Sequence, residues 1–341
     1  MAKGRSSGTE KRPTREDVAR IAKTSGTTVS RVLSGSSEIQ VPPEVRQRVL
    51  EAVRQLGYSP NAAAQALRSG RTGMIGFWMC LGYSRYRSQV ADEMQKLLGD
   101  AGLLMAVTDA DHELLFEHSL ARALRLPVDG IIAFDAWASA GAYAELQSGQ
   151  RPNAPFVSMG AYWSEAYSYV AVDLKAGAEE ATRHLIETGR NDIAYLAPWN
   201  SGLLTEGARY EGFRDQMAAA GRAPRTIAVE SSSIDGFEAA LREQPVLPDA
   251  ILCVNDDLAM DGVIALERLG LKAGDDIALV GFNGTEGTER CSVPITTIRQ
   301  PIEEMCRLAL SFLQAQLQDP KAPLQQRRLN PELIVRESSR R

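Results

Sequence analysis

The sequence predicts a small all-helical head followed by a larger α/β body that is built from two parallel sheets. Near the N-terminus, three short segments carry apolar residues at helical spacing. From Met74 onward, short apolar runs alternate with longer helical stretches, which is typical of parallel strands flanked by helices, and the runs are numerous enough for two sheets. A length of 341 residues favours more than one domain, and 44% apolar with 24% charged residues indicates a globular chain.

Charge is distributed unevenly between the head and the body. Residues 1–72 contain thirteen Lys or Arg and six Asp or Glu, a net charge of +7. The remaining residues contain 25 Lys or Arg and 37 Asp or Glu, a net charge of −12, so the whole chain carries −5. A basic head on an acidic body indicates a polyanionic partner for the head, although an unevenly charged solvated surface gives the same totals.

The head is predicted to span residues 14–59, after a polar and basic arm over residues 1–13 that we expect to be disordered. Thr14 and Asp17 have the spacing of a capping box at the start of a first helix. Ser25 follows a polar break and is a suitable N-cap for a second helix. These signals predict two short helices joined by a tight turn.

The second helix is predicted over residues 26–33, and a third helix is predicted to open at Pro42-Pro43-Glu44 and to be stopped by Gly57. Two short helices with a supporting third helix are the plan of a helix-turn-helix domain. Hydroxyl groups and a guanidinium on the exposed face of the second helix suit contacts with bases and phosphates; the residues are Thr27, Thr28, Ser30 and Arg31. A helical bundle that only packs on the rest of the chain remains the alternative.

The body is predicted to alternate strands and helices, with clefts at the carboxyl edges of its sheets. The expected strands are Met74–Met79, Leu103–Thr108, Asp129–Phe134, Pro155–Met159, Val170–Val172, Asp192–Leu196, Ala250–Val254 and Ile277–Val280. The expected helices include Ser88–Gly99, Ala176–Thr188, Thr205–Ala220 and Asp257–Leu269.

A long ordered set of motifs resembles the LacI/GalR family of bacterial transcriptional regulators over nearly the whole chain. In the head, the matching segments are TREDVARIAKTSGTTVSRVLSG (14–35) and RQRVLEAVRQLGYSPNAAAQALRSGRTGMIGF (46–77). In the body, they are VAVDLKAGAEEATRHLIETGRNDIAYL (170–196), ARYEGF (208–213), ILCVNDDLAMDGVIALERLG (251–270), DIALVGFN (276–283), PITTIRQP (294–301) and LNPELIVRESS (329–339).

The resemblance implies that the head reads DNA and that a hinge helix over residues 60–72 joins it to the body. The residue that matches Leu67 wedges into the minor groove in that family, although an ordinary flexible linker remains the alternative here. The implied DNA-binding residues are Thr14, Ser25, Thr27, Thr28, Ser30, Arg31, Asn61, Ala64 and Leu67.

Two residues of the head depart from the family pattern. Lys23 stands where the family usually has a small turn residue, often Gly, so the turn must differ or the lysine reaches a phosphate. Gly26 stands at the first position of the recognition helix, which commonly reads bases, and it has no side chain to do so. We therefore expect Thr27 and Arg31 to carry more of the sequence recognition.

For the body, the resemblance implies a periplasmic-binding-protein-like effector domain over residues 73–341. The expected N-lobe covers about 73–172 and 291–323, and the expected C-lobe covers about 173–290 and 324–341. The implied effector contacts are Arg209, Asn255 and Asn283. Asn255 is also a plain helix cap in the alternative reading, and Asn283 replaces the Asp that sugar-binding members often carry, so the effector differs from a plain neutral sugar or is held differently.

Three tryptophans, Trp78, Trp163 and Trp199, are predicted at or just beyond strand ends, where their rings stack on a sugar or only pack. Cys80, Cys253, Cys291 and Cys306 are scattered and, with the three histidines, form no metal-ligand spacing. No catalytic constellation or phosphate loop is present, so we expect neither an enzyme nor a metal nor a cofactor. No apolar run is long enough to span a membrane, and no signal peptide is recognisable.

The sequence thus predicts a cytoplasmic, homodimeric regulator that binds double-stranded DNA at a pseudo-palindromic operator and is controlled by a small, sugar-like effector. No apolar heptad extension follows the last motif, so a dimer is expected rather than a tetramer. Repression is the expected sign of regulation. The alternatives are an effector-independent regulator or an activator, a solute-binding protein, and a sugar-processing enzyme on an α/β scaffold.

Overall fold

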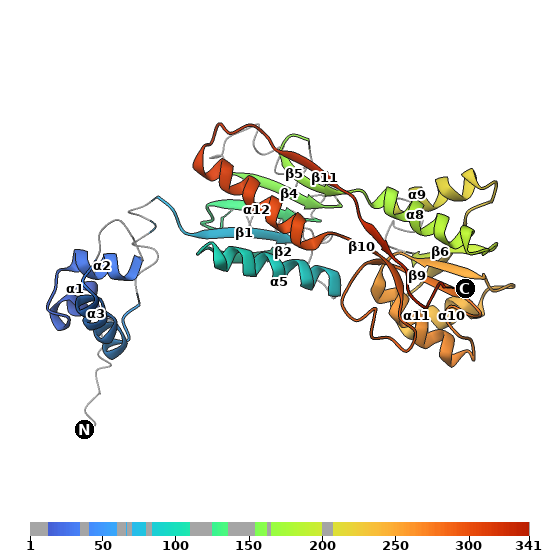
Figure 1. Ribbon diagram of the computed structural model, residues 1–341, viewed down its shortest axis with the longest axis horizontal. Coiled ribbons are helices and arrows are strands. Elements are labelled where there is room, and N and C mark those ends of the chain that lie inside the picture. Colours follow the sequence, from blue (N-terminus) through green and yellow to red (C-terminus); the bar gives the residue numbers. More distant parts are fainter. Residues whose placement is uncertain are drawn as a thin grey trace, which may run out of the picture. The chain divides into compact units, whose positions relative to one another are not determined.

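In the computed structural model, the chain divides into two compact units, Met1–Thr72 and Gly73–Arg341, each with its own hydrophobic core. The structure describes residues 13–34, 41–59, 66, 70–79, 84–109, 125–135, 154–161, 165–199 and 207–340 (Figure 1). Residues 1–12 of the predicted arm and the predicted DNA contacts Asn61, Ala64 and Leu67 lie outside these ranges, as do Trp163 and Cys80.

The described part of the first unit contains three helices, α1 (Arg15–Ile21), α2 (Gly26–Ser34) and α3 (Pro43–Leu56), which confirms the predicted helical head. Their apolar faces meet in a small core of Val18, Ala19, Ala22, Val29, Val32, Val49 and Ala52. Gly57 ends α3 with φ of 61°, a left-handed conformation that glycine adopts without steric cost.

The turn between α1 and α2 depends on a left-handed residue. Lys23 has φ of 50°, and Thr24 donates its N–H to the carbonyl of Ala19 at 3.0 Å. A side chain with a Cβ costs roughly 1–2 kcal/mol in this conformation, whereas glycine does not pay that cost. The conformation explains why a small residue, above all glycine, suits this position, and it shows that Lys23 occupies it with a left-handed backbone.

The first sheet of the second unit, which we call the N-lobe, has the order β11-β5-β4-β3-β1-β2, and all its strands are parallel. Its strands are β1 (Met74–Met79), β2 (Leu104–Asp109), β3 (Gly130–Phe134), β4 (Phe156–Gly160), β5 (Ser168–Val172) and β11 (Gln326–Leu329). Two helices, α5 (Arg85–Asp100) and α12 (Ile302–Gln318), pack against each other and against this sheet (Figure 1).

The second sheet, which we call the C-lobe, has the order β12-β10-β9-β8-β6-β7, with β12 antiparallel to β10. Its strands are β6 (Ile193–Pro198), β7 (Arg225–Val229), β8 (Ala250–Cys253), β9 (Ala278–Asn283), β10 (Thr296–Arg299) and β12 (Glu332–Ile334). Helices α8 (Leu174–Glu187) and α9 (Ala208–Ala219) pack together, as do α10 (Ile234–Arg242) and α11 (Asp256–Arg268).

The two helix pairs of the C-lobe cover opposite faces of its sheet. Gly177 of α8 lies against Phe282, and Gly262 of α11 lies against Leu279. These two β9 residues are three apart, so their side chains point to opposite faces. The two parallel-dominated sheets with flanking helices confirm the predicted fold class of the body.

The chain crosses between the lobes three times, at Asp173, after β10 at Gln300, and between β11 and β12 (Figure 1). The predicted division placed about 291–323 in the N-lobe and about 324–341 in the C-lobe, whereas β10 pairs in the C-lobe sheet and β11 pairs in the N-lobe sheet. The short strand β10 extends the C-lobe sheet beside β9 before the chain crosses, and the polar strand β11 adds an edge to the N-lobe beside β5.

The structure contains four strands that the eight predicted apolar runs do not include, namely β7, β10, β11 and β12. β7 and β11 are edge strands with several exposed residues, and β12 pairs with one neighbour only. Such strands need no continuous apolar run, because only one side of them is paired and their side chains face solvent in part.

Among the described residues, no helix has both the length and the apolar character that a membrane crossing requires.

We predict that Lys23→Gly stabilises the head by about 0.5–1 kcal/mol, because glycine relieves the left-handed strain while making the unfolded chain more flexible. Hydrogen exchange of the head amides in the full-length protein measures the effect. Lys23→Ala is the matched control, since it removes the amine but keeps the Cβ. Equal protection in the glycine and alanine variants would show that the strain is negligible.

Candidate functional site

The exposed face of α2 carries the side chains that the sequence predicts to contact DNA. Thr27 and Arg31 are exposed, while Thr28 and Ser30 are half-buried. The hydroxyl of Ser25 accepts a hydrogen bond from the Thr28 N–H at 3.1 Å and lies 2.9 Å from the Thr28 hydroxyl. Ser25 and Thr28 therefore close the N-terminus of α2, which leaves Thr27 and Arg31 as the more accessible groups.

Thr14 builds the start of α1 in the way that its spacing predicts. Its hydroxyl donates to the Asp17 carboxylate at 2.7 Å and accepts from the Asp17 N–H at 3.3 Å, and its own N–H donates to the same carboxylate at 3.0 Å. These hydrogen bonds, with Arg20 nearby, lower the pKa of Asp17 to about 2. The capping box is thus a structural feature, and a DNA contact of Thr14 stays a prediction.

In the body, Arg209 and Asn283 come together at the carboxyl edge of the C-lobe sheet. Arg209 lies in the first turn of α9 and donates from Nη2 to Oδ1 of Asn283 at 3.2 Å. Its guanidinium also lies over the ring of Phe282, 4.6 Å from the centroid. The two residues predicted as effector contacts therefore belong to one polar cluster with an aromatic floor.

The cluster continues through Gln300 to the other lobe. Nε2 of Gln300 donates to Oδ1 of Asn283 at 2.8 Å, and the Gln300 N–H donates to the carbonyl of Asn283 at 3.1 Å. The hydroxyl of Tyr86, on α5 of the N-lobe, donates to Oε1 of Gln300 at 2.9 Å. Burial raises the pKa of Tyr86 well above its usual range, which keeps this hydroxyl protonated as a donor.

Some polar groups of this region have no hydrogen-bond partner among the described residues. Oδ1 of Asn283 already accepts two hydrogen bonds, whereas Nδ2 makes none within the described residues. Nε of Arg209 and Oε1 of Gln89 are both buried and have no hydrogen-bond partner there either. Buried polar groups are normally paired, so an open donor and an open acceptor indicate a ligand that both accepts and donates.

Asn283 holds an unusual backbone conformation, with φ of 120°. Non-glycine residues seldom adopt such a positive φ, and strain of this kind is often found at binding sites. The side chain is nearly buried, and the two donors that converge on its oxygen hold it in place. The side-chain amide of Asn283 is thus held in a fixed orientation at the end of β9.

Asn255 also lies at the carboxyl edge of the C-lobe sheet. Leu252 of β8 pairs with Val280 of β9, and Asn255 and Asn283 each lie three residues beyond this pair in sequence. Oδ1 of Asn255 accepts the N–H of Leu258 at 2.9 Å, which caps α11. Helix capping, the simpler of the two predicted roles, is therefore present. Nδ2 of Asn255 makes no hydrogen bond within the described part of the chain, and an effector contact of this residue stays a prediction.

Asp256 supports this edge from inside the C-lobe. Its fully buried carboxylate accepts hydrogen bonds from the N–H of Thr285 at 2.7 Å, from the hydroxyl of Thr285 at 3.1 Å and from the hydroxyl of Thr297 at 2.5 Å. Burial nevertheless raises its pKa to about 6. The residue ties α11 to β10 and to the loop after β9, and so it fixes the neighbourhood of Asn283.

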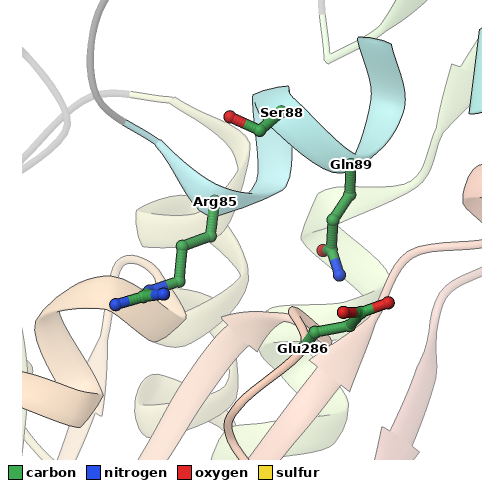
Figure 2. Close-up of a pocket in the computed structure, with 4 residues that line it drawn as sticks. All are labelled: Arg85, Ser88, Gln89 and Glu286. Atoms are coloured by element: carbon green, nitrogen blue, oxygen red, sulfur yellow. The ribbon is translucent and has the colours of Figure 1, made fainter. Parts of the chain in front are cut away.

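A second polar link joins the lobes beside a pocket of about 290 Å³ that is lined by Arg85, Ser88, Gln89 and Glu286. Nε of Arg85 on α5 lies 3.1 Å from Oδ1 of Asp257 on α11. Gln89 of the N-lobe points toward Glu286 of the C-lobe (Figure 2). Gln89 lies one turn along α5 from Tyr86, so the pocket adjoins the interlobe cluster.

The tryptophans differ in their surroundings. Trp78 is fully buried, and its indole packs edge-on against Phe156 with ring centroids 6.0 Å apart. This burial favours a packing role for Trp78 over stacking on a sugar ring. Trp199 is 63% exposed directly after β6, where its ring is free to meet a ligand, and this role stays a prediction.

Sequence reasoning missed Tyr86, Gln300 and Asp256. Gln300 lies in the matched segment PITTIRQP directly after a strand, so its position was a usable signal. Tyr86 carried no comparable signal, because its contact depends on how α5 packs on a segment 214 residues away.

Comparisons with known proteins identify both units. Residues 14–61 match the bacterial regulatory proteins of the lacI family, and residues 182–339 match a periplasmic binding protein-like domain. The HTH-type transcriptional regulator DegA of Bacillus subtilis is 30% identical over 343 residues, 95% of this chain and 97% of DegA. The ribose operon repressor of Halalkalibacterium halodurans is 28% identical over 328 residues, 95% of this chain and 96% of that protein.

A crystal structure of the lac repressor dimer bound to operator and the anti-inducer ONPF has the same fold, with a TM-score of 0.78 at 24% identity over 97% of this chain and all of that chain. A helical head of this kind on a two-lobed body defines a DNA-binding transcriptional regulator. The identity and coverage shared with DegA show the family: this chain belongs to the LacI family of bacterial regulatory proteins.

We predict that Asp256 makes the stability of the body depend on pH. Because its pKa is about 6 in the folded chain and 3.8 without burial, its contribution is fully present below about pH 4 and is lost as the pH rises through 6. The loss amounts to about 3 kcal/mol at most.

Urea unfolding followed by tryptophan fluorescence tests this, because all four tryptophans lie after residue 72 and report on the body alone. The difference in unfolding free energy between wild type and Asp256→Asn is expected to shift in favour of Asn between pH 4 and pH 6.5. A difference that stays constant over this range would mean that burial does not perturb the carboxyl group.

Proposed function

We propose that this protein is a dimeric repressor that binds a pseudo-palindromic operator through paired heads and responds to a small, sugar-like effector bound between its lobes. The observation that carries the proposal is the Arg209–Asn283–Gln300 cluster, which reaches both lobes of a chain whose head belongs to a DNA-binding family. Two relatives are named as regulators or repressors, and the lac repressor structure is a dimer on its operator.

The open polar groups set the chemistry of the effector. Arg209 Nε and Asn283 Nδ2 offer donors, and Gln89 Oε1 offers an acceptor. Hydroxyl groups both donate and accept, so a polyhydroxylated molecule satisfies all three. Phe282 beneath the guanidinium keeps Arg209 in position, and the exposed ring of Trp199 offers a surface for stacking.

Control of DNA binding follows from the two interlobe links. A ligand that bonds to groups of both lobes favours one lobe arrangement over another, and it shifts the protein toward that arrangement by its difference in affinity. Such a shift couples the effector site to the operator site reciprocally. No enzyme activity and no cofactor are part of the proposal, and we expect the protein to act in the cytoplasm, where its DNA partner lies.

The proposal is tested by selection of genomic DNA fragments bound by the purified full-length protein. Enrichment of an inverted repeat near a few promoters is the expected result, with binding that weakens steeply as the salt concentration rises. Enrichment without any symmetric site would reject specific operator binding. Binding of the enriched site that no sugar or related metabolite alters would instead indicate an effector-independent regulator.

We predict that Arg209→Lys weakens the effector response at least tenfold and leaves operator affinity without effector unchanged. A lysine cannot donate to Asn283 and to a ligand at the same time in the geometry of a guanidinium. The measurement is operator release, titrated with a compound that changes tryptophan fluorescence in a screen of mono- and disaccharides.

Arg214→Lys is the matched control, because Arg214 lies on the same helix and pairs with Asp215 on the surface. It is expected to respond like the wild type. If Arg209→Lys and Arg214→Lys released the operator at the same effector concentration, Arg209 would not be an effector contact.

A further inference from the structure

A guanidinium from α1 occupies the space beside the first residue of the recognition helix α2. That residue is Gly26, and a Cβ built on it would lie 2.9 Å from Nε of Arg15 and 3.4 Å from Cζ. A side chain at position 26 and the present position of Arg15 therefore exclude each other. The chain has a glycine where side chains usually read bases and a long cationic side chain directly over it.

Arg15 is accessible from the side that a DNA partner would occupy. Its side chain is 40% exposed and is not part of the head core, and Thr27, the next residue of α2, is exposed as well. The Arg15 side chain thus lies at the beginning of the same exposed surface that carries Thr27 and Arg31.

A carboxylate holds Arg15 in this position. Oε1 of Glu16 accepts from Nε of Arg15 at 3.0 Å and from Nη2 at 2.6 Å. The Glu16 side chain is 67% exposed, and exposed ion pairs of this kind contribute little to stability. Breaking this exposed pair therefore costs little, and the freed Nε–Nη2 edge presents two parallel donors, the arrangement that fits O6 and N7 of guanine.

We propose that Arg15 reads a guanine in each half-site of the operator, in place of the side chain that Gly26 lacks. In the free protein Glu16 keeps the guanidinium over Gly26, and on DNA the major-groove edge of the base replaces Glu16. The proposal rests on the proposed operator binding, and it assigns a specificity-determining contact to α1 rather than to the recognition helix.

The test compares full-length variants on a library of the selected operator in which each base pair is changed singly. Wild type is expected to prefer guanine at one symmetric position by about tenfold. Arg15→Gln is expected to lose that preference and to favour adenine there, because a carboxamide pairs with N6 and N7 of adenine. Preferences at all other positions are expected to stay the same.

Arg20→Gln is the matched control, because Arg20 is an exposed arginine of the same helix, paired with Asp17, and its loss changes the charge equally. It is expected to lower affinity uniformly and to leave every preference intact. Gly26→Ala supplies a second variant with a helix-favouring residue; its Cβ must displace Arg15, so the guanine preference is expected to weaken.

The proposal fails if Arg15→Gln lowers affinity for all operators alike, as Arg20→Gln does, since Arg15 would then contribute charge only. It also fails if Gly26→Ala keeps the full guanine preference. A wild-type protein that selects no symmetric site would overturn the proposed function itself, which distinguishes that failure from a failure of the Arg15 assignment.

Discussion

The arrangement of the body depends on the side chain of Gln300, which joins the two lobes by hydrogen bonds. Its oxygen accepts from Tyr86 of the N-lobe, and its nitrogen donates to Asn283 of the C-lobe. Gln300 is only 3% exposed, so separating the lobes would leave buried polar groups unpaired at about 1–3 kcal/mol each unless water replaces the bonds. Because Gln300 also lies at the second chain crossing, lobe movement and polar pairing are coupled at one residue.

The sequence predicts those parts of the body that depend on local pattern. Central strands such as β1, β3 and β9 are buried on both faces and read as continuous apolar runs, whereas the edge strands β7 and β11 have exposed residues and do not. For the same reason the lobe boundaries near residues 300 and 330 could not be placed, because nothing in a short polar strand indicates which sheet it joins.

In the candidate sites, too, the features set by local sequence can be predicted, whereas those set by tertiary packing cannot. In the head, the caps at Thr14 and Ser25 follow from local spacing, and the left-handed turn at Lys23 lies where the family pattern favours glycine. In the body, Arg209 and Asn283 can be recognised from motifs at element ends. The hydrogen bonds that connect them through Gln300 to Tyr86 cannot be recognised in this way, because they depend on how α5, β9 and β10 pack together.

The segment Asn255–Asp256–Asp257 shows how one short motif serves both lobes. Asn255 caps α11, Asp256 holds Thr285 and Thr297 inside the C-lobe, and Asp257 pairs with Arg85 of the N-lobe. Each polar group has a separate structural task, so the composition of this motif is set by the fold as well as by any ligand. A ligand that enters beside it meets side chains already fixed in orientation, which reduces the conformational entropy lost on binding and favours recognition of one stereochemical arrangement of hydroxyl groups over others.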